Sequence, residues 1–131
     1  MRAYLAIKFH EDYRNKRLIE EILDALDKSG FETTTIVRDY EKWGKIRFKP
    51  KELMDLAFKL IRESDFLIIE FSEKGIGLGI EAGYAYSMNI PIIILAKKGS
   101  DISETMKGIA KELIFYEKPE ELEQKLKEIQ I

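Results

Sequence analysis

Five short apolar runs recur along the chain, and each is followed by a segment with a different period. The runs cover residues 3–9, 31–37, 65–71, 90–96 and 112–117. DFLIIEF and IPIIILA, the third and fourth, are almost continuously apolar, which is typical of strands covered on both faces. FETTTIV, the second, is rich in β-branched residues, which favour strands. The runs therefore predict five β-strands.

The segments between the runs predict helices. Leucine and isoleucine recur at spacings of three and four in residues 18–26 and 53–61, so each segment presents one apolar stripe. Gly30 stands where a helix-ending glycine belongs, and Pro50 suits the first turn of the second helix. Further helices are expected near residues 78–88, 103–111 and 119–130, whereas residues 38–49 lack a clear period and predict a loop.

Strands and helices alternate five times, which predicts an α/β fold with a doubly wound, five-stranded parallel sheet. We expect the flavodoxin-like strand order and a single domain over residues 1–131. Ligands of such sheets bind beyond the carboxyl ends of the strands. The loops that follow Phe9, Val37, Phe71 and Ala96 should therefore line any site.

The composition excludes several kinds of chemistry but does not identify the function. The 131 residues include no cysteine and one histidine, His10, which argues against thiol catalysis, disulfides and a multi-histidine metal site. A net charge of −2 does not favour nucleic acid as a partner. No apolar run approaches the roughly 20 residues of a membrane span, and no signal peptide is expected. We therefore expect a cytoplasmic protein that needs no metal or cofactor and does not contact membranes.

The stretch EKGIGLGIEAGYAYSMN carries the candidate chemistry. Gly75, Gly77 and Gly79 follow the third strand, where glycine lets a ligand approach the main chain closely. Glu81 follows them, in or near the first turn of the next helix. Two interpretations stand side by side: a first-turn glutamate favoured by the helix dipole, or a partly desolvated carboxylate placed for nucleophilic or acid–base work. Small residues after it, Gly83 among them, should let the helix lie close to the sheet.

The order of these pieces resembles the nucleoside 2-deoxyribosyltransferase family, and most of all its 2'-deoxynucleoside 5'-phosphate N-hydrolase branch. The likeness covers roughly residues 3–116 and is strongest in residues 64–95. The family pattern there is a small residue and an aspartate, an apolar strand, an acid, and then G-x-G-x-E-x-G-x-A. The matching positions are Ser64 and Asp65, Phe66 to Ile69, Glu70, and then Gly77, Gly79, Glu81, Gly83 and Ala85.

The resemblance implies an enzyme that cleaves or transfers the N-glycosidic bond of a nucleoside or nucleoside 5'-monophosphate. Glu81 would be the nucleophile that attacks the sugar, as in retaining glycosidases. Asp65 matches a position that is structural in the family. The resemblance further implies a homodimer or larger assembly with sites completed across the interface. The substrate-binding positions that it implies are Tyr4, Ala6, Lys8, Gly75, Gly77, Gly79 and Ser103.

Three positions depart from the family pattern. The first loop lacks its glycine, although Lys8 could meet a phosphate as a point charge. The family's acid on the helix before the third strand, which assists the leaving base, falls at Ala57, and Asp55 lies about 200° further around that helix. Gly75 stands where the phosphate-specific branch has serine. Ser103 matches a phosphate-binding serine, but it also suits a helix N-cap.

The departures leave a rival function open, a non-catalytic domain that binds or senses a nucleotide, and also a protein that keeps only the fold. Tyr40, Trp43 and Phe48 in the long loop could stack on a base, or could simply pack on the surface. His10 could serve as a base, although a histidine facing solvent is the more frequent outcome at such a loop.

Overall fold

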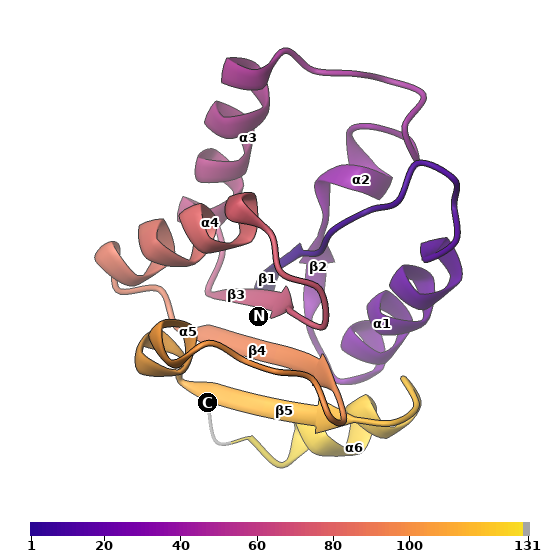
Figure 1. Cartoon of the computed structure of the whole chain (residues 1–131), viewed down its shortest axis with the longest axis vertical. Helices are drawn as coiled ribbons and strands as arrows, with labels where there is room; N and C mark the ends of the chain where they lie inside the picture. The colour runs from indigo at the N-terminus through magenta and orange to yellow at the C-terminus, as the bar shows by residue number, and fades with distance from the viewer. Residues whose placement is uncertain (130–131) are drawn as a thin grey trace.

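The computed structural model describes residues 1–129 of the chain, and it contains a five-stranded parallel sheet between two layers of helices (Figure 1). The strand order β2-β1-β3-β4-β5 is the flavodoxin-like order predicted from the sequence. The strands are β1 (Arg2–Ala6), β2 (Glu32–Thr34), β3 (Phe66–Glu70), β4 (Ile92–Lys97) and β5 (Glu112–Tyr116).

Helices connect each strand to the next, and a final helix follows β5. They are α1 (Lys16–Lys28), α2 (Ile36–Asp39), α3 (Pro50–Arg62), α4 (Ile76–Ser87), α5 (Glu104–Ile109) and α6 (Glu121–Lys127). Gly30 follows α1 with a positive φ of 94°, and Pro50 opens α3, as the sequence predicted. The prediction of a strand over residues 31–37 was wrong at its end, because Ile36 and Val37 belong to helix α2 and do not extend β2.

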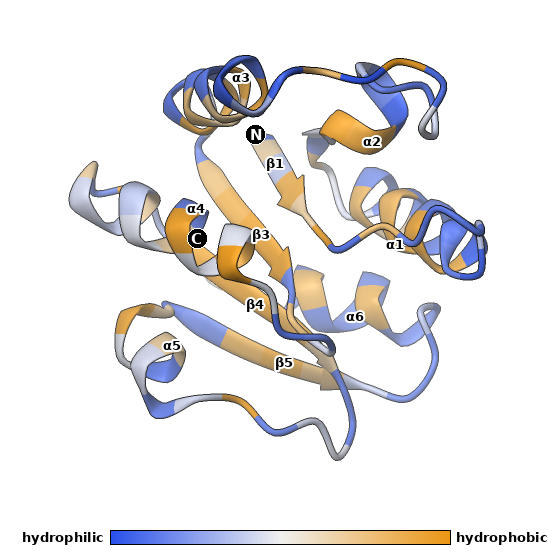
Figure 2. Cartoon of the chain, turned by 45° about the horizontal axis from the view of Figure 1, so that its top comes forward, coloured by the Kyte–Doolittle hydropathy of each residue, from blue (hydrophilic) through white to orange (hydrophobic). Residues whose placement is uncertain are grey.

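Alternate strand residues face opposite sides of the sheet, so each strand contributes to two cores. Leu5, Ile68 and Ile93 pack under α1 and α6. Tyr4, Ile69 and Ile94 face the layer of α3, α4 and α5. Figure 2 shows the largely apolar strands β3 and β4 between helices such as α1 and α6, which carry both hydrophobic and hydrophilic residues. Apolar runs covered on both faces therefore explain why the strands could be found from sequence.

The two ends of the sheet have different roles. At the amino end, the Asp65 carboxylate accepts a hydrogen bond of 2.9 Å from the backbone N–H of Arg2, which ties the entry of β3 to the start of β1. At the carboxyl end, the loops after β1 and α2, together with α3 and α4, surround a cavity. Along residues 1–129, no helix combines the length and apolar character that crossing a membrane requires.

Candidate functional site

A cavity of about 410 Å³ opens beside the carboxyl end of β1, in the layer of α2, α3 and α4. Its volume lies within the range of small-molecule sites, about 300–1,000 Å³. Tyr4 and Ala6 of β1 form one side and Gly77 and Glu81 of α4 form another. The wall contributed by α3 and the two neighbouring loops is mostly apolar, and it includes Phe9, Ile46, Phe48, Leu53, Met54 and Ala57.

Glu81 carries a partly buried carboxylate on this cavity. Its Oε2 atom is inaccessible to solvent and has no hydrogen-bond partner within the described residues. Burial raises the pKa of Glu81 to about 7, against a smaller opposing effect of the Tyr4 hydroxyl. A buried oxygen without a partner costs free energy unless a ligand or proton satisfies it. Such a carboxylate at a cavity wall has the properties of a reactive group.

Glu81 lies one turn deeper in its helix than the sequence suggested. The α4 helix begins at Ile76, so Glu81 is its sixth residue, and the first turn contains no acidic residue. The interpretation of Glu81 as a first-turn glutamate favoured by the helix dipole is therefore wrong. Ala82 and Ala85 are fully buried. Because small residues occupy the inner face of α4, the helix lies close to the sheet and directs Glu81 toward β1.

The glycines of α4 divide between the cavity and the solvent. Gly77 lines the cavity, and a Cβ atom placed on it would meet no atom within 4 Å, so the space beside it is open. Gly79 and Gly83 are exposed. Gly83 therefore does not mediate the close packing predicted for it. Gly75 is the N-cap of α4 and does not line the cavity.

Tyr4 faces the Glu81 carboxylate from β1. Its side chain is 3% exposed. Burial raises the pKa of Tyr4 well above its ordinary value, and the neighbouring charge of Glu81 acts in the same direction. The hydroxyl therefore stays protonated and can donate to Glu81 when that carboxylate is ionised. Among the residues predicted from sequence, the structure brings Tyr4, Ala6, Gly77 and Glu81 together.

Lys8 and Ser103 lie away from this cavity. Lys8 points to the opposite side of the loop, where its ammonium is 3.9 Å from Glu73 Oε2. Ser103 is the N-cap of α5, and its Oγ accepts a hydrogen bond from Met106 N at 3.4 Å. The cap interpretation of Ser103 therefore matches the geometry within one chain.

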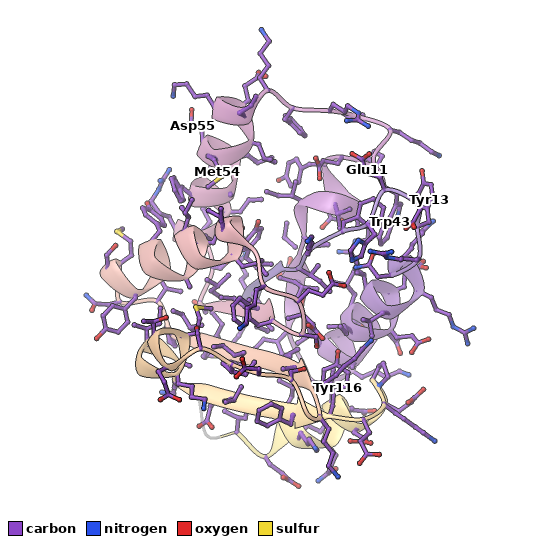
Figure 3. The ribbon with its side chains drawn as sticks, viewed as in Figure 1. Glu11, Tyr13, Trp43, Met54, Asp55 and Tyr116 are labelled. Carbon is purple, nitrogen blue, oxygen red and sulfur yellow. The ribbon has the colours of Figure 1, made fainter. Side chains whose placement is uncertain are left out.

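The α3 helix presents no carboxylate to the cavity. Met54 and Ala57 line the cavity, whereas Asp55 is exposed and its Oδ2 accepts a hydrogen bond of 2.8 Å from Lys51 Nζ. Figure 3 shows Asp55 on the side of α3 that faces away from α2. A local shift of the helix does not bring Asp55 inward, so the acid expected at Ala57 is not replaced from α3.

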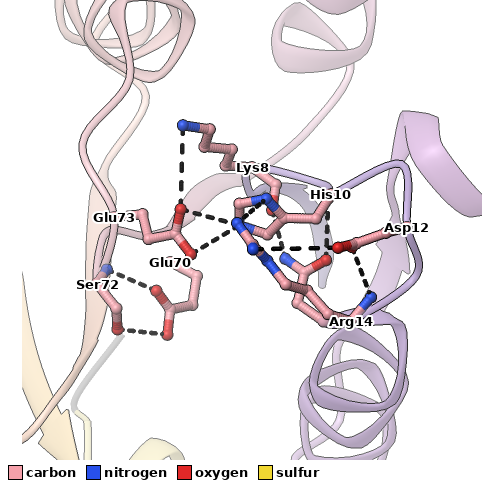
Figure 4. Close-up of polar contacts among 8 residues, drawn as sticks. Lys8, His10, Asp12, Arg14, Glu70, Ser72 and Glu73 are labelled. Carbon is pink, nitrogen blue, oxygen red and sulfur yellow. Dashed lines mark hydrogen bonds and ion pairs between the residues drawn. The ribbon is translucent and has the colours of Figure 1, made fainter.

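Polar residues of the loops after β1 and β3 form hydrogen bonds and ion pairs with one another (Figure 4). His10 Nε2 lies 2.7 Å from Glu73 Oε1, and Arg14 Nη2 lies 2.9 Å from His10 Nδ1, an arrangement in which Nε2 donates and Nδ1 accepts. Only 13% of the His10 side chain is exposed. His10 therefore joins the loop after β1 to the loop after β3, and it is neither the solvent-facing residue that was expected nor a group on the cavity.

Glu70, the acid of the family pattern, is buried and fully engaged at the end of β3. Its carboxylate accepts hydrogen bonds from Ser72 N at 2.6 Å, from Ser72 Oγ at 2.9 Å and from the Tyr116 hydroxyl. Ser72 Oγ in turn accepts from Lys97 N at 2.8 Å. This network ties β3, β4 and β5 together, so Glu70 has a structural role.

An acidic residue of the long loop, Glu41, faces the cavity and was not among the predicted site residues. Glu41 lines the cavity with Arg47 and Phe48, while Glu11 enters from the loop after β1. Arg47 Nη2 lies 3.3 Å from Glu11 Oε1, across the rim. Trp43 packs against Phe9, with ring centroids 5.8 Å apart, so it supports the loop. Phe48 thus fits the base-stacking alternative and Trp43 fits the surface-packing one.

The described residues contain no group of three or more histidine, aspartate or glutamate side chains arranged to hold a metal ion. The cavity is instead an apolar chamber with carboxylates on two walls and one guanidinium at the rim.

Comparison with known proteins agrees with the resemblance seen in the motif. The sequence matches no family model. It is 29% identical to the "Putative 2'-deoxynucleoside 5'-phosphate N-hydrolase 1" of Thermofilum pendens, over 96% of this chain and 92% of that protein. A second protein of that name, from Syntrophotalea carbinolica, is 46% identical over 41 residues, which are 31% of this chain and 29% of that protein.

Two solved structures have the same fold. The Clostridium botulinum CMP N-glycosidase BcmB superposes with a TM-score of 0.70 at 24% identity, over 96% of this chain and 97% of that one. The 2-deoxyribosyltransferase of Bacillus psychrosaccharolyticus gives a TM-score of 0.70 at 14% identity, over 94% and 90%. Similarity in sequence to these N-hydrolases and in fold to the two solved structures therefore supports the resemblance to the nucleoside 2-deoxyribosyltransferase family.

Proposed function

We propose that the protein cleaves or transfers the N-glycosidic bond of a nucleoside or nucleoside 5'-monophosphate, with Glu81 as the nucleophile. The observation that carries the proposal is the Glu81 carboxylate on the cavity wall, with one buried oxygen that no described group satisfies. The relatives support the reaction class in its coarser form, since their names describe N-hydrolase, N-glycosidase and deoxyribosyltransferase activities.

The protonation state of Glu81 suits this chemistry. With its pKa raised to about 7 by burial, the carboxylate of Glu81 titrates in the neutral pH range. Desolvation makes the ionised form a stronger nucleophile than a solvated glutamate, and the Tyr4 hydroxyl can steady the charge until it attacks. The carboxylate would displace the base from C1' and hold the sugar as an ester, and water or an acceptor base would then release it.

The cavity offers distinct surroundings to the two halves of a nucleoside. Gly77 leaves open space beside Glu81, where the sugar must lie for attack on C1'. Phe48 and Met54 provide an apolar wall suited to the flat face of a base. Gly75 and Gly79 lie outside this chamber, so we assign the sugar contact to Gly77 alone among the three glycines.

One experiment tests the proposal. The purified protein is incubated with a panel of nucleosides and 5'-monophosphates, with and without an acceptor base, and released or exchanged base is measured by chromatography. We expect turnover of at least one member, and a loss of at least about 10³-fold in Glu81→Gln, as for removal of other essential catalytic groups. Exchange with an acceptor would indicate a transferase, and release alone would indicate a hydrolase. Equal activity in Glu81→Gln would refute the assignment of the nucleophile.

Ala57 favours a second candidate, a domain that binds a nucleotide without turning it over. The cavity has no carboxylate from α3, where the resemblance implies the acid that assists the leaving base. Calorimetric binding of a nucleotide with no release of base by the intact protein would support this alternative.

We also propose that the protein forms a homodimer or a larger homo-oligomer. The outer face of α4 exposes large apolar side chains: Ile76 is 85% exposed, Ile80 48% and Tyr86 58%. Exposed apolar side chains gathered on one helix are typical of an interaction surface. Sedimentation velocity of the intact protein tests this, and a monomer at micromolar concentration would contradict it.

A further inference from the structure

Glu41 comes from the loop after α2 and lines the same cavity as Glu81, which comes from α4. Glu41 lies next to Tyr40, the C-cap of α2, and its half-buried side chain lines the same chamber as Tyr4 and Glu81. The charge of Glu41 is close enough to Tyr4 to raise the pKa of that hydroxyl, while Glu81 acts on the same hydroxyl at closer range. Carboxylates from two different elements therefore line one cavity together with Tyr4.

The backbone fixes the position of Glu41. Its N–H donates to the Ile36 carbonyl at 2.8 Å, and its own carbonyl accepts from Ile46 N at 2.9 Å. Between these contacts the chain makes a left-handed turn, with φ of 48° at Lys42 and 59° at Trp43. Such conformations cost roughly 1–2 kcal/mol per residue and persist only where the surroundings enforce them. Trp43 N donates to the Val37 carbonyl at 2.7 Å, and this contact holds the turn.

The carboxylate of Glu41 is not committed to a structural partner. Burial raises its pKa from the ordinary value, and the charge of Arg47 opposes this effect without a hydrogen bond to Glu41. Arg47 is instead paired with Glu11 at the rim. The charged groups that line the cavity with Glu41 are thus Glu11 and Arg47 at the entrance and Glu81 inside, beside the neutral Tyr4 hydroxyl. Glu41 has room to protonate a ligand, whereas Glu70, the buried acid on β3, is already occupied by hydrogen bonds.

We propose that Glu41 is the general acid–base catalyst of this site and supplies from the long loop the carboxyl group that α3 lacks at Ala57. The inference rests on the proposed function. A nucleophile and an acid on opposite sides of the scissile bond is the arrangement that glycosidic cleavage requires. Here Glu81 would occupy the sugar side and Glu41 would face the base.

The two steps balance in atoms and charge. In the first, an oxygen of ionised Glu81 bonds to C1', the C1'–N electron pair moves to the base, and the carboxylic acid of Glu41 transfers its proton to the base. In the second, ionised Glu41 takes a proton from water as the water oxygen bonds to C1'. The ester bond to Glu81 breaks, its electron pair returns to the carboxylate, and both glutamates regain their starting states.

Substrates that differ only in the leaving group test the role of Glu41. A base that leaves readily without protonation needs no acid, so Glu41→Gln should be nearly silent on it. For a pyrimidine substrate, uracil is compared with 5-nitrouracil as the leaving base. For a purine substrate, guanine is compared with N7-methylguanine. We expect Glu41→Gln to lower kcat/KM by about 10²–10⁴-fold for the ordinary base and by less than about 10-fold for the activated one.

Each outcome has a defined meaning. An intact enzyme that turns over both substrates, with Glu41→Gln equally active on both or equally impaired on both, overturns the acid assignment and leaves the proposed function standing. An intact protein that releases no base from any substrate overturns the proposed function and this inference together. Glu20→Gln, on the exposed face of α1, is the matched control and should behave as the intact protein. Thermal unfolding of each variant excludes a folding defect, and Glu41→Asp should restore part of the lost activity.

Discussion

Replacing Glu81 with glutamine should stabilise the folded protein above neutral pH, because the carboxylate is buried at a cost. In the folded state Glu81 keeps its proton up to a pKa of about 7, whereas its ordinary pKa is 4.5. Between these values the folded form binds more protons than the unfolded form. The free energy of unfolding of the parent therefore falls as pH rises through this interval. Each pH unit corresponds to about 1.4 kcal/mol, so the full penalty above pH 8 is about 3 kcal/mol.

Urea denaturation of the parent and of Glu81→Gln, at intervals from pH 4 to pH 8.5, measures this penalty. Glutamine has the shape of the protonated side chain and cannot ionise, so the two proteins should have similar stability near pH 4. The variant should exceed the parent by about 3 kcal/mol at pH 8.5, with Glu20→Gln following the parent throughout. A stability difference that is the same at pH 4 and pH 8.5 would refute the reasoning, since a pH-independent effect cannot arise from ionisation of Glu81.

Further predictions concern residues at the site and residues that stabilise the surrounding fold or its assembly. Tyr4→Phe removes the hydroxyl that opposes the burial effect, so the pKa of Glu81 should rise further. The acidic limb of the pH–activity profile should move to higher pH, and an unmoved limb would contradict the contact. Ser103→Ala should cost about 1 kcal/mol of stability through loss of the α5 cap, measured by urea denaturation. A loss of phosphate-dependent affinity without a loss of stability would instead favour a binding role. Asp65→Ala should lower stability by about 1–2 kcal/mol by removing the tie to β1, while nucleotide affinity stays unchanged by calorimetry. Ile80→Glu should dissociate the assembly in sedimentation velocity, and an unchanged sedimentation coefficient would exclude the α4 face as the contact.

The sheet could be predicted because each strand is indicated by residues adjacent in the sequence. Strands covered on both faces are apolar runs, and alternation with amphipathic helices determines that they are parallel. Residues 36 and 37 show where this logic fails. Ile36 and Val37 favour a strand by composition, but the Asp39 carboxylate accepts from Thr35 N at 3.0 Å and begins α2 there. A carboxylate four residues after the cap is a weaker sequence signal than two β-branched residues.

The candidate site was predictable only in part, because its second wall depends on an irregular loop. Glu81 and Gly77 belong to a regular helix whose spacing determines which residues face β1. Glu41 is placed at the cavity by the left-handed turn that follows it at residues 42 and 43. Residues other than glycine rarely adopt this backbone conformation, and the hydrophobic pattern of the sequence does not predict it. Lys8 was expected at the site from the resemblance to the family's first loop, and the loop turns its ammonium toward Glu73 instead.

The central claim is that Glu81 forms a covalent bond to the sugar, and trapping that bond tests the claim most directly. A nucleotide with fluorine at the 2' position of the sugar slows the transition states that build positive charge at C1', so the glycosyl-enzyme can accumulate. After incubation and digestion, mass spectrometry of the peptides should find one added glycosyl group, located on Glu81. Base release in one full equivalent with no adduct on Glu81, or an adduct on another residue, would contradict the account.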